Sequence, residues 1–439
     1  MRPLLPATLA TGLLTATLLT APTAQAAAET CQGQPATIVG SWLQRGLVGT
    51  EGADVVVTNG ASQVDTLGGN DLVCVTESEG RFSSLDLDTG AGDDVVDAST
   101  SRTPMDVVLG AGSDRYTGSA RGGDRIVAGA STTDDSEPDT IHTGSGELAD
   151  HVTSGTPGVP NGDVVVVEQP GSRVSWSGPM ADGARLDASA GPGSTLSMDL
   201  GTGHSVVDAE AGTLAKDGFV TLRWTGFDDF VFEGRQAPRA FRFDGSDRDE
   251  TVYVSYSDPG RQRFFLGGGD DTLLSPDGAG RSKSWYVGGD GDDHVDLWAG
   301  RRLNLDLATG KMRMRQAGKT VKGRFVEFET SRLGARNLVM RGTKRADEIR
   351  FYACTATVRG RAGNDDIATA RTGDDGYLLD CDSRKSRIRI YGDAGRDDIR
   401  GSRGKDLLVG GPGRDTINGN ANRDRCSGEK LKSCEIKLR

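Results

Sequence analysis

Short apolar runs separated by glycine-rich turns recur along most of the chain. In the middle, between residues 161 and 265, they read DVVVVEQ, GSRVSWSG, ARLDAS, FVTLRWTG and RAFRFDG, and Gly, Asp or Ser bounds each one. Within these runs apolar and polar residues alternate, or β-branched residues follow one another, which is typical of short strands. We find no long helical period beyond the N-terminal segment. The pattern therefore predicts an all-β protein.

Near the C-terminus the pattern has a period of nine residues. Glycines stand at Gly392, Gly401, Gly410 and Gly419, and an aspartate follows each after five positions, at Asp397, Asp406, Asp415 and Asp424. The best copy, GGPGRDTI, begins at Gly410 and has its third glycine at Gly413. Its first six residues have turn chemistry, and the residues after them form a short strand. Two such half-coils make a circuit of about 18 residues, and stacked circuits form a parallel β-roll or β-helix solenoid with strands about 4.8 Å apart.

The aspartates of alternate half-coils fall on the same side of this predicted stack. Asp397 stacks with Asp415, and Asp406 stacks with Asp424. Carboxylates one strand spacing apart repel each other, and the glycine-rich turns direct backbone carbonyls into the same space. Ca²⁺ prefers an all-oxygen environment of this kind, whereas Mg²⁺ requires a tighter octahedron. The spacing therefore predicts Ca²⁺ sites on two sides of the coil.

The repeat resembles the hemolysin-type (RTX) calcium-binding nonapeptide, G-G-x-G-x-D-x-U-x, a β-helix signature. Further copies are GGDGDDHV, GRAGNDDI and GTEGADVV, and partial copies are TLGGNDLV, TGAGDDVV, LGAGSDRY and LGGGDDTL. The resemblance implies that the position-6 aspartates bind Ca²⁺, helped by carbonyls of the turn glycines. The candidate ligands are Asp54, Asp71, Asp94, Asp114, Asp271, Asp293, Asp365, Asp397, Asp406, Asp415 and Asp424, with Gly392, Gly401, Gly410 and Gly413 in the turns.

Some copies depart from this pattern. In the terminal run position 5 is basic, and Asn422 replaces a glycine at position 4. An isolated copy such as the one at Gly49 lacks an in-register partner one circuit away. For such copies an ion-free turn, in which the aspartate caps its own loop, remains the alternative.

Four regions follow after a signal peptide at residues 1–26. They are an N-terminal region with scattered repeats (27–160), a degenerate β-solenoid (161–265), a C-terminal solenoid (266–425) with four in-register nonapeptides at 392–426, and a disulfide-closed cap (426–439). A longer repeat matches LSMDLGTG at Leu196 to LNLDLATG at Leu303, which pairs Gly203 with Gly310. A continuous solenoid explains this most simply. Separate β-domains joined near residues 157–160 are the alternative.

The formal net charge of −12 argues against a nucleic-acid-binding protein. The stretch from residue 382 to the end is basic, with 15 Lys and Arg against nine Asp and Glu. Such an end could contact extracellular or cell-wall polysaccharide, although the same cations also offset the repulsion between acidic turns. No segment beyond the signal is long and apolar enough to span a membrane.

The N-terminus has the features of a secretory signal: Arg2, an apolar run from Leu4 to about Leu19, and an A-x-A pattern ending at Ala26. Six cysteines in a secreted chain suggest disulfides. Their grouping along the chain favours Cys31–Cys74, Cys354–Cys381 and Cys426–Cys434. We therefore expect a protein released outside the cell.

No catalytic motif stands out, because HExxH and GxSxG are both missing. We expect a secreted, non-enzymatic calcium-binding solenoid with a structural or surface and matrix role. The alternative is a parallel β-helix lyase or epimerase acting on polysaccharide, with RWTGFDDFVFEGRQAPRAFRFDG as the stretch to inspect.

Overall fold

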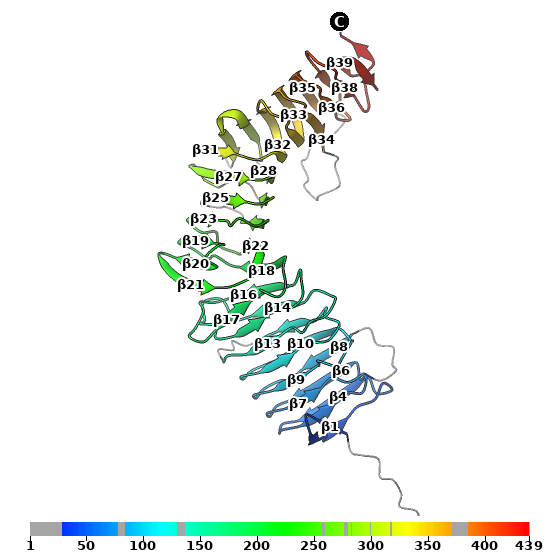
Figure 1. Ribbon diagram of the computed structural model, residues 1–439, viewed down its shortest axis with the longest axis vertical. Coiled ribbons are helices and arrows are strands. Elements are labelled where there is room, and N and C mark those ends of the chain that lie inside the picture. The colour runs from blue at the N-terminus through cyan, green and yellow to red at the C-terminus, as the bar shows by residue number, and fades with distance from the viewer. Residues whose placement is uncertain are drawn as a thin grey trace, which may run out of the picture.

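The computed structural model describes residues 29–77, 84–129, 137–256, 260–275, 280–281, 283–298, 300–316, 318–370 and 385–438. The predicted signal peptide lies outside these ranges. The chain forms an elongated stack of short strands that rises from the N-terminal to the C-terminal end (Figure 1). The prediction of an all-β parallel solenoid is confirmed. Across the described ranges, none of the helices has the length and apolar character needed to cross a membrane.

The coils contribute strands alternately to two parallel sheets. Sheet 1 contains β4 (Gly46–Thr50), β6 (Gln63–Leu67), β8 (Leu85–Asp88), β10 (Met105–Val108), β12 (Arg125–Val127), β14 (His151–Ser154), β16 (Arg173–Trp176), β18 (Ser194–Met198), β22 (Phe227–Glu233), β24 (Thr251–Ser255), β26 (Thr272–Ser275), β28 (His294–Trp298), β34 (Asp366–Thr369), β36 (Asp398–Arg400), β38 (Thr416–Asn418) and β40 (Lys430–Lys432).

Sheet 2 contains β3 (Ile38–Val39), β5 (Val55–Val57), β7 (Leu72–Cys74), β9 (Val95–Asp97), β11 (Arg115–Thr117), β13 (Thr140–His142), β15 (Val164–Val166), β17 (Arg185–Asp187), β19 (His204–Asp208), β20 (Thr213–Lys216), β21 (Phe219–Arg223), β23 (Ala240–Asp244), β25 (Arg261–Gly268), β27 (Ser284–Asp290), β29 (Arg302–Asp306), β30 (Lys311–Gln316), β31 (Lys319–Val326), β35 (Arg387–Ala394), β37 (Leu407–Val409), β39 (Arg425–Ser427) and β41 (Ile436–Lys437). The long strands β32 (Thr330–Arg341) and β33 (Glu348–Ala362) run through both sheets. They join the pairings of the two sheets into one closed network.

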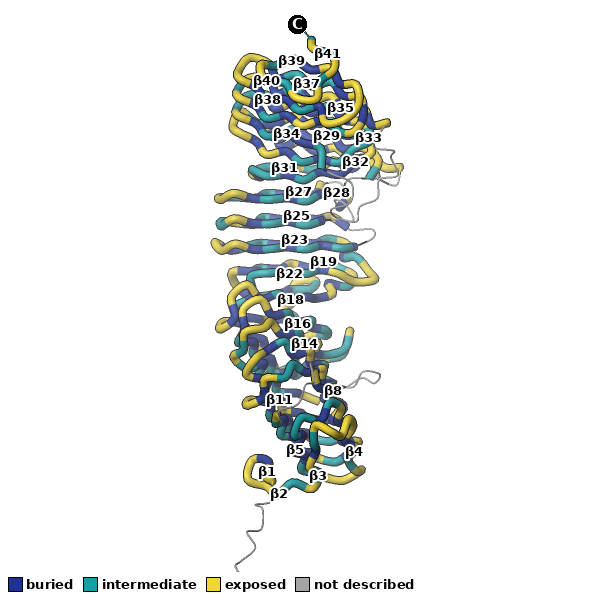
Figure 2. The backbone as a smooth tube through the Cα atoms, turned by 90° about the vertical axis from the view of Figure 1, so that its right-hand side faces the viewer, coloured by how far each residue is buried: buried dark blue, intermediate teal, exposed yellow. Residues whose placement is uncertain are grey.

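A narrow hydrophobic core runs between the sheets from Leu47 to Cys426 as one continuous cluster. Strand residues alternate between buried positions and intermediate or exposed ones, and most exposed residues lie in the turns (Figure 2). Aromatic residues widen the core in the middle, where Phe230, Phe243 and Phe264 are fully buried. Parallel pairing crosses residues 157–160, because β13 pairs with β15 and β14 with β16. The pairing therefore gives no break at the position that the alternative of separate β-domains requires.

Two antiparallel meanders interrupt the parallel stack in sheet 2. They are β19–β20–β21 and β29–β30–β31. Each places three strands in sheet 2, while in sheet 1 the strands on either side of the meander pair directly, as β18 with β22 and β28 with β32. The extra strands make the stack longer on the side of sheet 2 than on the side of sheet 1, so the stack bends. Figure 1 shows the rod change direction at both meanders, with sheet 2 on the convex side.

The positions of the meanders show that the predicted alignment of the longer repeat, which pairs Gly203 with Gly310, is wrong. The strand around Leu196 is β18 of sheet 1, whereas the strand around Leu303 is β29 of sheet 2. The equivalent of Gly310 is therefore Gly212, and Gly203 is not. Both Gly212 and Gly310 have a left-handed φ, of 59° and 63°, and close the same turn after β19 and β29. In both turns an aspartate caps a backbone N–H three residues later, Asp208 in the first and Asp306 in the second.

Both ends of the stack carry a disulfide. At the first end the hairpin β1 (Thr30–Cys31) and β2 (Gln34–Pro35) is held by Cys31–Cys74, and at the last end Cys426–Cys434 closes the chain. Both pairings confirm the prediction from the sequence. Cys354 is also disulfide-bonded. Its predicted partner Cys381 lies outside the described residues.

Candidate metal centre

Buried carboxylates form ladders along the stack in the C-terminal coils. Asp397 and Asp415 precede β36 and β38, and the backbone N–H of Asp397 donates to Oδ1 of Asp415 (3.0 Å). Asp406 and Asp424 precede β37 and β39, and the N–H of Asp406 donates to Oδ1 of Asp424 (2.9 Å). All four side chains are at most 3% exposed. The structure thus places the four aspartates on two sides of the coil, as their spacing indicates.

The same ladder occurs where the sequence shows only scattered copies. One N-terminal ladder links Asp54, Asp71, Asp94, Asp114, Asp139 and Asp163. Its rungs lie 17, 23, 20, 25 and 24 residues apart. The expectation that the copy at Gly49 lacks an in-register partner is therefore wrong, because Asp54 is the first rung. Turns of different length loop outward and still return the next aspartate to the same place on the strand.

Further ladders complete the set. One links Asp124, Asp150 and Ser172 on the opposite side of the coil, one links Glu250, Asp271, Asp293 and Glu329, and one links Asp347, Asp365, Asp397, Asp415 and Glu429. In the cap Glu429 and Glu435 accept the N–H groups of Asp415 and Asp424, so each terminal ladder ends on a glutamate.

The second carboxylate oxygen of many rungs is buried without a hydrogen bond. Within the described ranges this holds for Oδ2 of Asp71, Asp94, Asp150, Asp271, Asp293, Asp365, Asp397, Asp415 and Asp424. A buried charged oxygen without a partner is costly. Its regular repetition along the stack indicates that these oxygens face a common ligand.

Glycine leaves room beside these oxygens. A Cβ atom on Gly392 would meet Oδ2 of Asp397 and, at 2.8 Å, the carbonyl oxygen of Gly410 in the next coil. A Cβ on Gly410 would likewise meet Oδ2 of Asp415. The rungs at Asp397 and Asp424 therefore combine an unpartnered carboxylate oxygen with a stacked backbone carbonyl, of Gly410 and Ser433, in a space that any side chain at position 1 would fill.

Other rungs satisfy the second oxygen within the protein. Oδ2 of Asp406 accepts hydrogen bonds from the N–H (2.6 Å) and the hydroxyl (2.9 Å) of Ser402. Oδ2 of Asp54 accepts hydrogen bonds from the N–H and the hydroxyl of Thr50 in the same way. At Asp347 the N–H of Thr343 donates to Oδ2 and its hydroxyl donates to Oδ1. Each of these hydroxyl residues occupies position 2 of its repeat. Asp54 and Asp406 are candidate ligands from their position in the nonapeptide, and in the structure Oδ2 of each accepts hydrogen bonds from the protein.

The carboxyl groups with the unpartnered oxygens have raised pKa values. Burial, followed by the charge of neighbouring carboxylates, raises the pKa of Asp94, Asp365 and Asp424 to about 7 and that of Asp271 to about 8. At Asp54 burial also acts to raise the pKa, but hydrogen bonds from Thr50 and Thr37 outweigh it and lower the pKa. At Asp406 burial outweighs the hydrogen bonds from Ser402, and the pKa is raised there too.

The sequence motif missed several rungs, among them Asp139, Asp150, Asp163, Asp347 and Glu250. Their turns lack the three glycines of the nonapeptide. A shorter signal would have found most of them, namely an acidic residue directly before a strand whose second residue is a buried Val or Ile, as in Asp139-Thr140-Ile141. Residues 6 to 8 of the nonapeptide have this same pattern.

A comparison with known protein families finds a match in the terminal repeats. The family model of the RTX calcium-binding nonapeptide repeat (4 copies) matches residues 389–429. This segment contains the rungs Asp397, Asp406, Asp415 and Asp424. The RTX repeat binds Ca²⁺, so Ca²⁺ is the cofactor of this segment. No curated protein matches the chain.

The residues of the ladders fit this ion. Within the described part of the chain, no three His, Cys, Asp or Glu side chains form a metal-binding cluster. A cation on a ladder would therefore take many of its ligands from the backbone, and stacked backbone carbonyls such as that of Gly410 would supply them. Carboxylate and carbonyl oxygens together form the hard, flexible ligand set that suits Ca²⁺. The residues that would hold it are those with an unpartnered Oδ2 atom.

The stretch considered for an enzyme site builds the core instead. Trp224, Phe230, Phe232, Phe241 and Phe243 are all buried and pack against one another.

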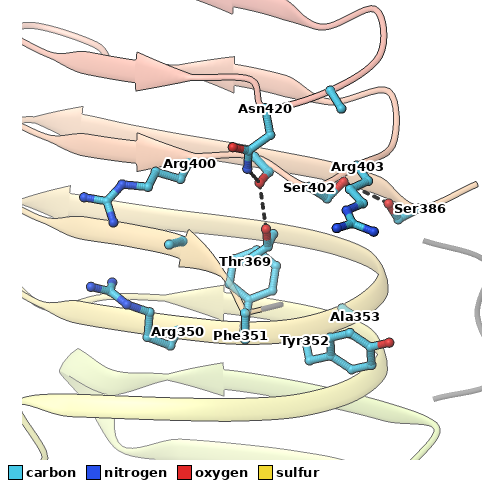
Figure 3. A pocket seen from close by; sticks show the side chains of 14 residues that line it. Arg350, Phe351, Tyr352, Ala353, Thr369, Ser386, Arg400, Ser402, Arg403 and Asn420 are labelled. Carbon is cyan, nitrogen blue, oxygen red and sulfur yellow. Dashed lines mark hydrogen bonds between the residues drawn. The ribbon is translucent and has the colours of Figure 1, made fainter. Parts of the chain in front are cut away.

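A separate hollow of about 590 Å³ lies by the ends of β33, β34 and β36 (Figure 3). Its polar groups include Arg350, Thr369 and Ser402. It borders the break in the described chain between Ala370 and Lys385, and we assign it no role.

Replacing Ser402 by alanine tests the protein-satisfied rung. The variant leaves Oδ2 of Asp406 with only the backbone N–H, so we expect a loss of about 1–3 kcal/mol in calcium-free buffer. Ser427→Ala is the control, because no side-chain hydrogen bond of Ser427 is seen among the described residues. Urea unfolding followed by circular dichroism gives both values. Equal stability of the two variants would contradict the assignment.

The ladder carboxyls also predict a pH dependence in calcium-free buffer. Burial raises the folded-state pKa of Asp94, Asp365 and Asp424 to about 7, well above the usual pKa of an aspartate in the unfolded chain. The folded state therefore binds more protons than the unfolded state between these values, and stability falls as pH rises from 5 to 8. Ca²⁺ replaces the protons, so its stabilising effect is expected to be largest at pH 8. Melting temperatures at pH 5 to 8, with and without Ca²⁺, test this, and a calcium-free melting temperature that rises with pH would contradict it.

Proposed function

We propose that this chain is a secreted calcium-binding solenoid that completes its folding outside the cell and acts as a structural or surface and matrix protein. The observation that carries the proposal is the regular series of buried Oδ2 atoms without a hydrogen bond along the stack. The two described disulfides and the secretory signal features of the N-terminus support an extracellular location.

The binding energy of the ion becomes folding energy, because the unfolded chain has no preformed site. Unbound ladders hold carboxylates close together without a counter-charge, which destabilises the coils. Extracellular calcium modules bind at roughly 10⁻⁴–10⁻³ M. A site of this affinity stays empty at low calcium and fills outside the cell. Calcium thereby orders the terminal coils after export.

A calcium titration of the mature protein tests the proposal. We expect far-UV circular dichroism to show a gain of β signal, and the melting temperature to rise, when Ca²⁺ is added to protein stripped of metal. Mg²⁺ at the same concentration should have a much smaller effect, because it requires a tight octahedron. The proposal would be overturned if the spectrum is already β-rich without calcium and if Ca²⁺ does not change the melting temperature.

A further inference from the structure

Sheet 2 carries two rows of basic residues on its outer side. Row 1 follows the strand register through β23, β25, β27, β31, β30, β29, β32, β33 and β35, and contains Arg242, Arg263, Trp285, Arg324, Lys311, Asp306, Arg341, Arg359 and Tyr391. Row 2 lies beside it and contains Arg261, Lys322, Arg313, Asn304, Val339, Thr357 and Arg389. Together the rows hold ten cations and one carboxylate.

The carboxylate of row 1 is already neutralised, because Asp306 forms an ion pair with Arg361 (2.8 Å). Arg242 and Arg359 also have acidic partners, in Asp244 and Asp393. The other cations of the rows make no ion pair within the described ranges: Arg261, Arg263, Lys311, Arg313, Lys322, Arg324, Arg341 and Arg389. The rows therefore carry a net positive charge on an otherwise acidic protein.

On sheet 1 of the same coils one register row contains Arg332, Arg350 and Arg400, but each of these is paired with a carboxylate, of Asp296, Asp366 and Asp398 respectively. A second register row, through Asp229, Thr251, Thr272, His294, Thr330, Glu348, Asp366, Asp398 and Thr416, contains no Lys or Arg. The opposite sheet surfaces of one stack thus differ in charge. This asymmetry is not needed to balance the acidic turns, which lie at the strand ends.

Aromatic rings lie within the basic surface. Trp285 is 38% exposed, and the guanidinium groups of Arg263 and Arg324 lie 5.6 and 5.7 Å from its ring centroid. Arg359 stacks on Tyr391 at 4.2 Å. Stacking of this kind holds guanidinium groups in place and lowers the entropy lost when they bind an anion. An exposed indole also offers an apolar surface beside the charges.

We propose that rows 1 and 2 bind an extended anionic polysaccharide that lies along the rod axis. The rows present one residue per strand, about 4.8 Å apart, which suits a linear polymer that carries charge at regular intervals. Guanidinium groups bind carboxylates in a bidentate manner. The overall net charge of −12 repels a densely charged duplex, and the disulfides indicate an extracellular protein. Both observations favour polysaccharide over nucleic acid. The inference rests on the extracellular location in the proposed function and adds a ligand class to it.

The test uses the mature protein in calcium-containing buffer, with an oligogalacturonate as the probe, neutral dextran as the uncharged polymer and a DNA duplex as the competing class. The variant Arg324→Glu/Arg341→Glu reverses two charges of row 1. Arg115→Glu/Arg223→Glu makes the same change in net charge at two exposed arginines outside the rows. Calorimetry measures binding, and the calcium response of each variant confirms that it folds.

We expect oligogalacturonate, but not dextran, to bind. The affinity should fall at least tenfold in Arg324→Glu/Arg341→Glu and change less than twofold in the control pair. Equal losses in both pairs would show a general charge effect and overturn the assignment to the rows. Equal or tighter binding of DNA would overturn the ligand class, and no binding to correctly folded protein would overturn the proposal. A variant that loses the polysaccharide but keeps its calcium response leaves the proposed function intact.

Discussion

Replacing Gly413 by alanine is expected to unfold the terminal coils or to destabilise them by about 3 kcal/mol or more. Gly413 has a φ of 155°, and a Cβ atom there would collide with the carbonyl oxygen of Gly395 in the preceding coil. That carbonyl is backbone and cannot rotate away. The collision would spread the coils and pull the stacked carbonyls away from the Oδ2 atoms, so calcium affinity should fall together with stability.

Gly158→Ala separates backbone strain from this collision. Gly158 also has a positive φ, of 84°, but a Cβ atom there would meet nothing within 4 Å. We expect it to cost about 1–2 kcal/mol, as an ordinary left-handed residue does. Urea unfolding in saturating Ca²⁺ gives the stability, and calorimetry gives the calcium affinity. Similar losses of stability in the two variants, with calcium affinity unchanged in both, would contradict the stacked-carbonyl site.

Removal of the first disulfide is expected to cost about 4 kcal/mol in the stability of the first coils. Cys31–Cys74 closes a separation of 43 residues and ties the β1–β2 hairpin to β7. Without the disulfide the unfolded chain between the two cysteines gains conformational entropy. The β1–β2 hairpin is then no longer held covalently over the end of the core. Solenoid ends need such covers, because a terminal coil buries only one side against a neighbour.

Hydrogen exchange measures this effect where it should occur. In Cys31→Ser/Cys74→Ser we expect faster exchange of the amides in β5 and β7, with little change in β36 and β38. The double variant Cys426→Ser/Cys434→Ser is the matched comparison and should affect only the last coils, by about 2–3 kcal/mol for its shorter separation of 8 residues. Uniform exchange along the rod would show that the stack unfolds as one unit and that the covers do not act locally.

The sequence was sufficient to predict the solenoid and the two-sided terminal ladders, because a period of nine residues leaves little choice of register. Asp397 and Asp415 lie 18 residues apart and stack as expected. The N-terminal ladder was harder to predict. Its coils vary from 17 to 25 residues, since insertions in the outer turns leave the strand positions unchanged. The position of an aspartate in the nonapeptide also did not reveal whether a hydroxyl residue would donate a hydrogen bond to its second oxygen, as Ser402 does to Asp406 and Thr50 does to Asp54.

Two further features depend on register that no local pattern shows. Alternation of apolar and polar residues is the same in parallel and antiparallel strands, so the meanders were not predicted, and the longer repeat was aligned on Gly203 instead of Gly212. The basic rows bring together residues as distant as Arg242 and Arg389. From the sequence, the polysaccharide contact was expected in the basic C-terminal stretch. The strand pairing instead gathers cations into aligned rows from β23 to β35.

A crystal of the mature protein grown with Ca²⁺ gives the most direct test of the calcium ladders. An anomalous difference map should show ions in the terminal coils beside the unpartnered Oδ2 atoms of Asp397, Asp415 and Asp424. We expect no ion at Oδ2 of Asp406, where Ser402 already donates two hydrogen bonds. Ions absent from the unpartnered oxygens, or bound equally at Asp406, would contradict the account.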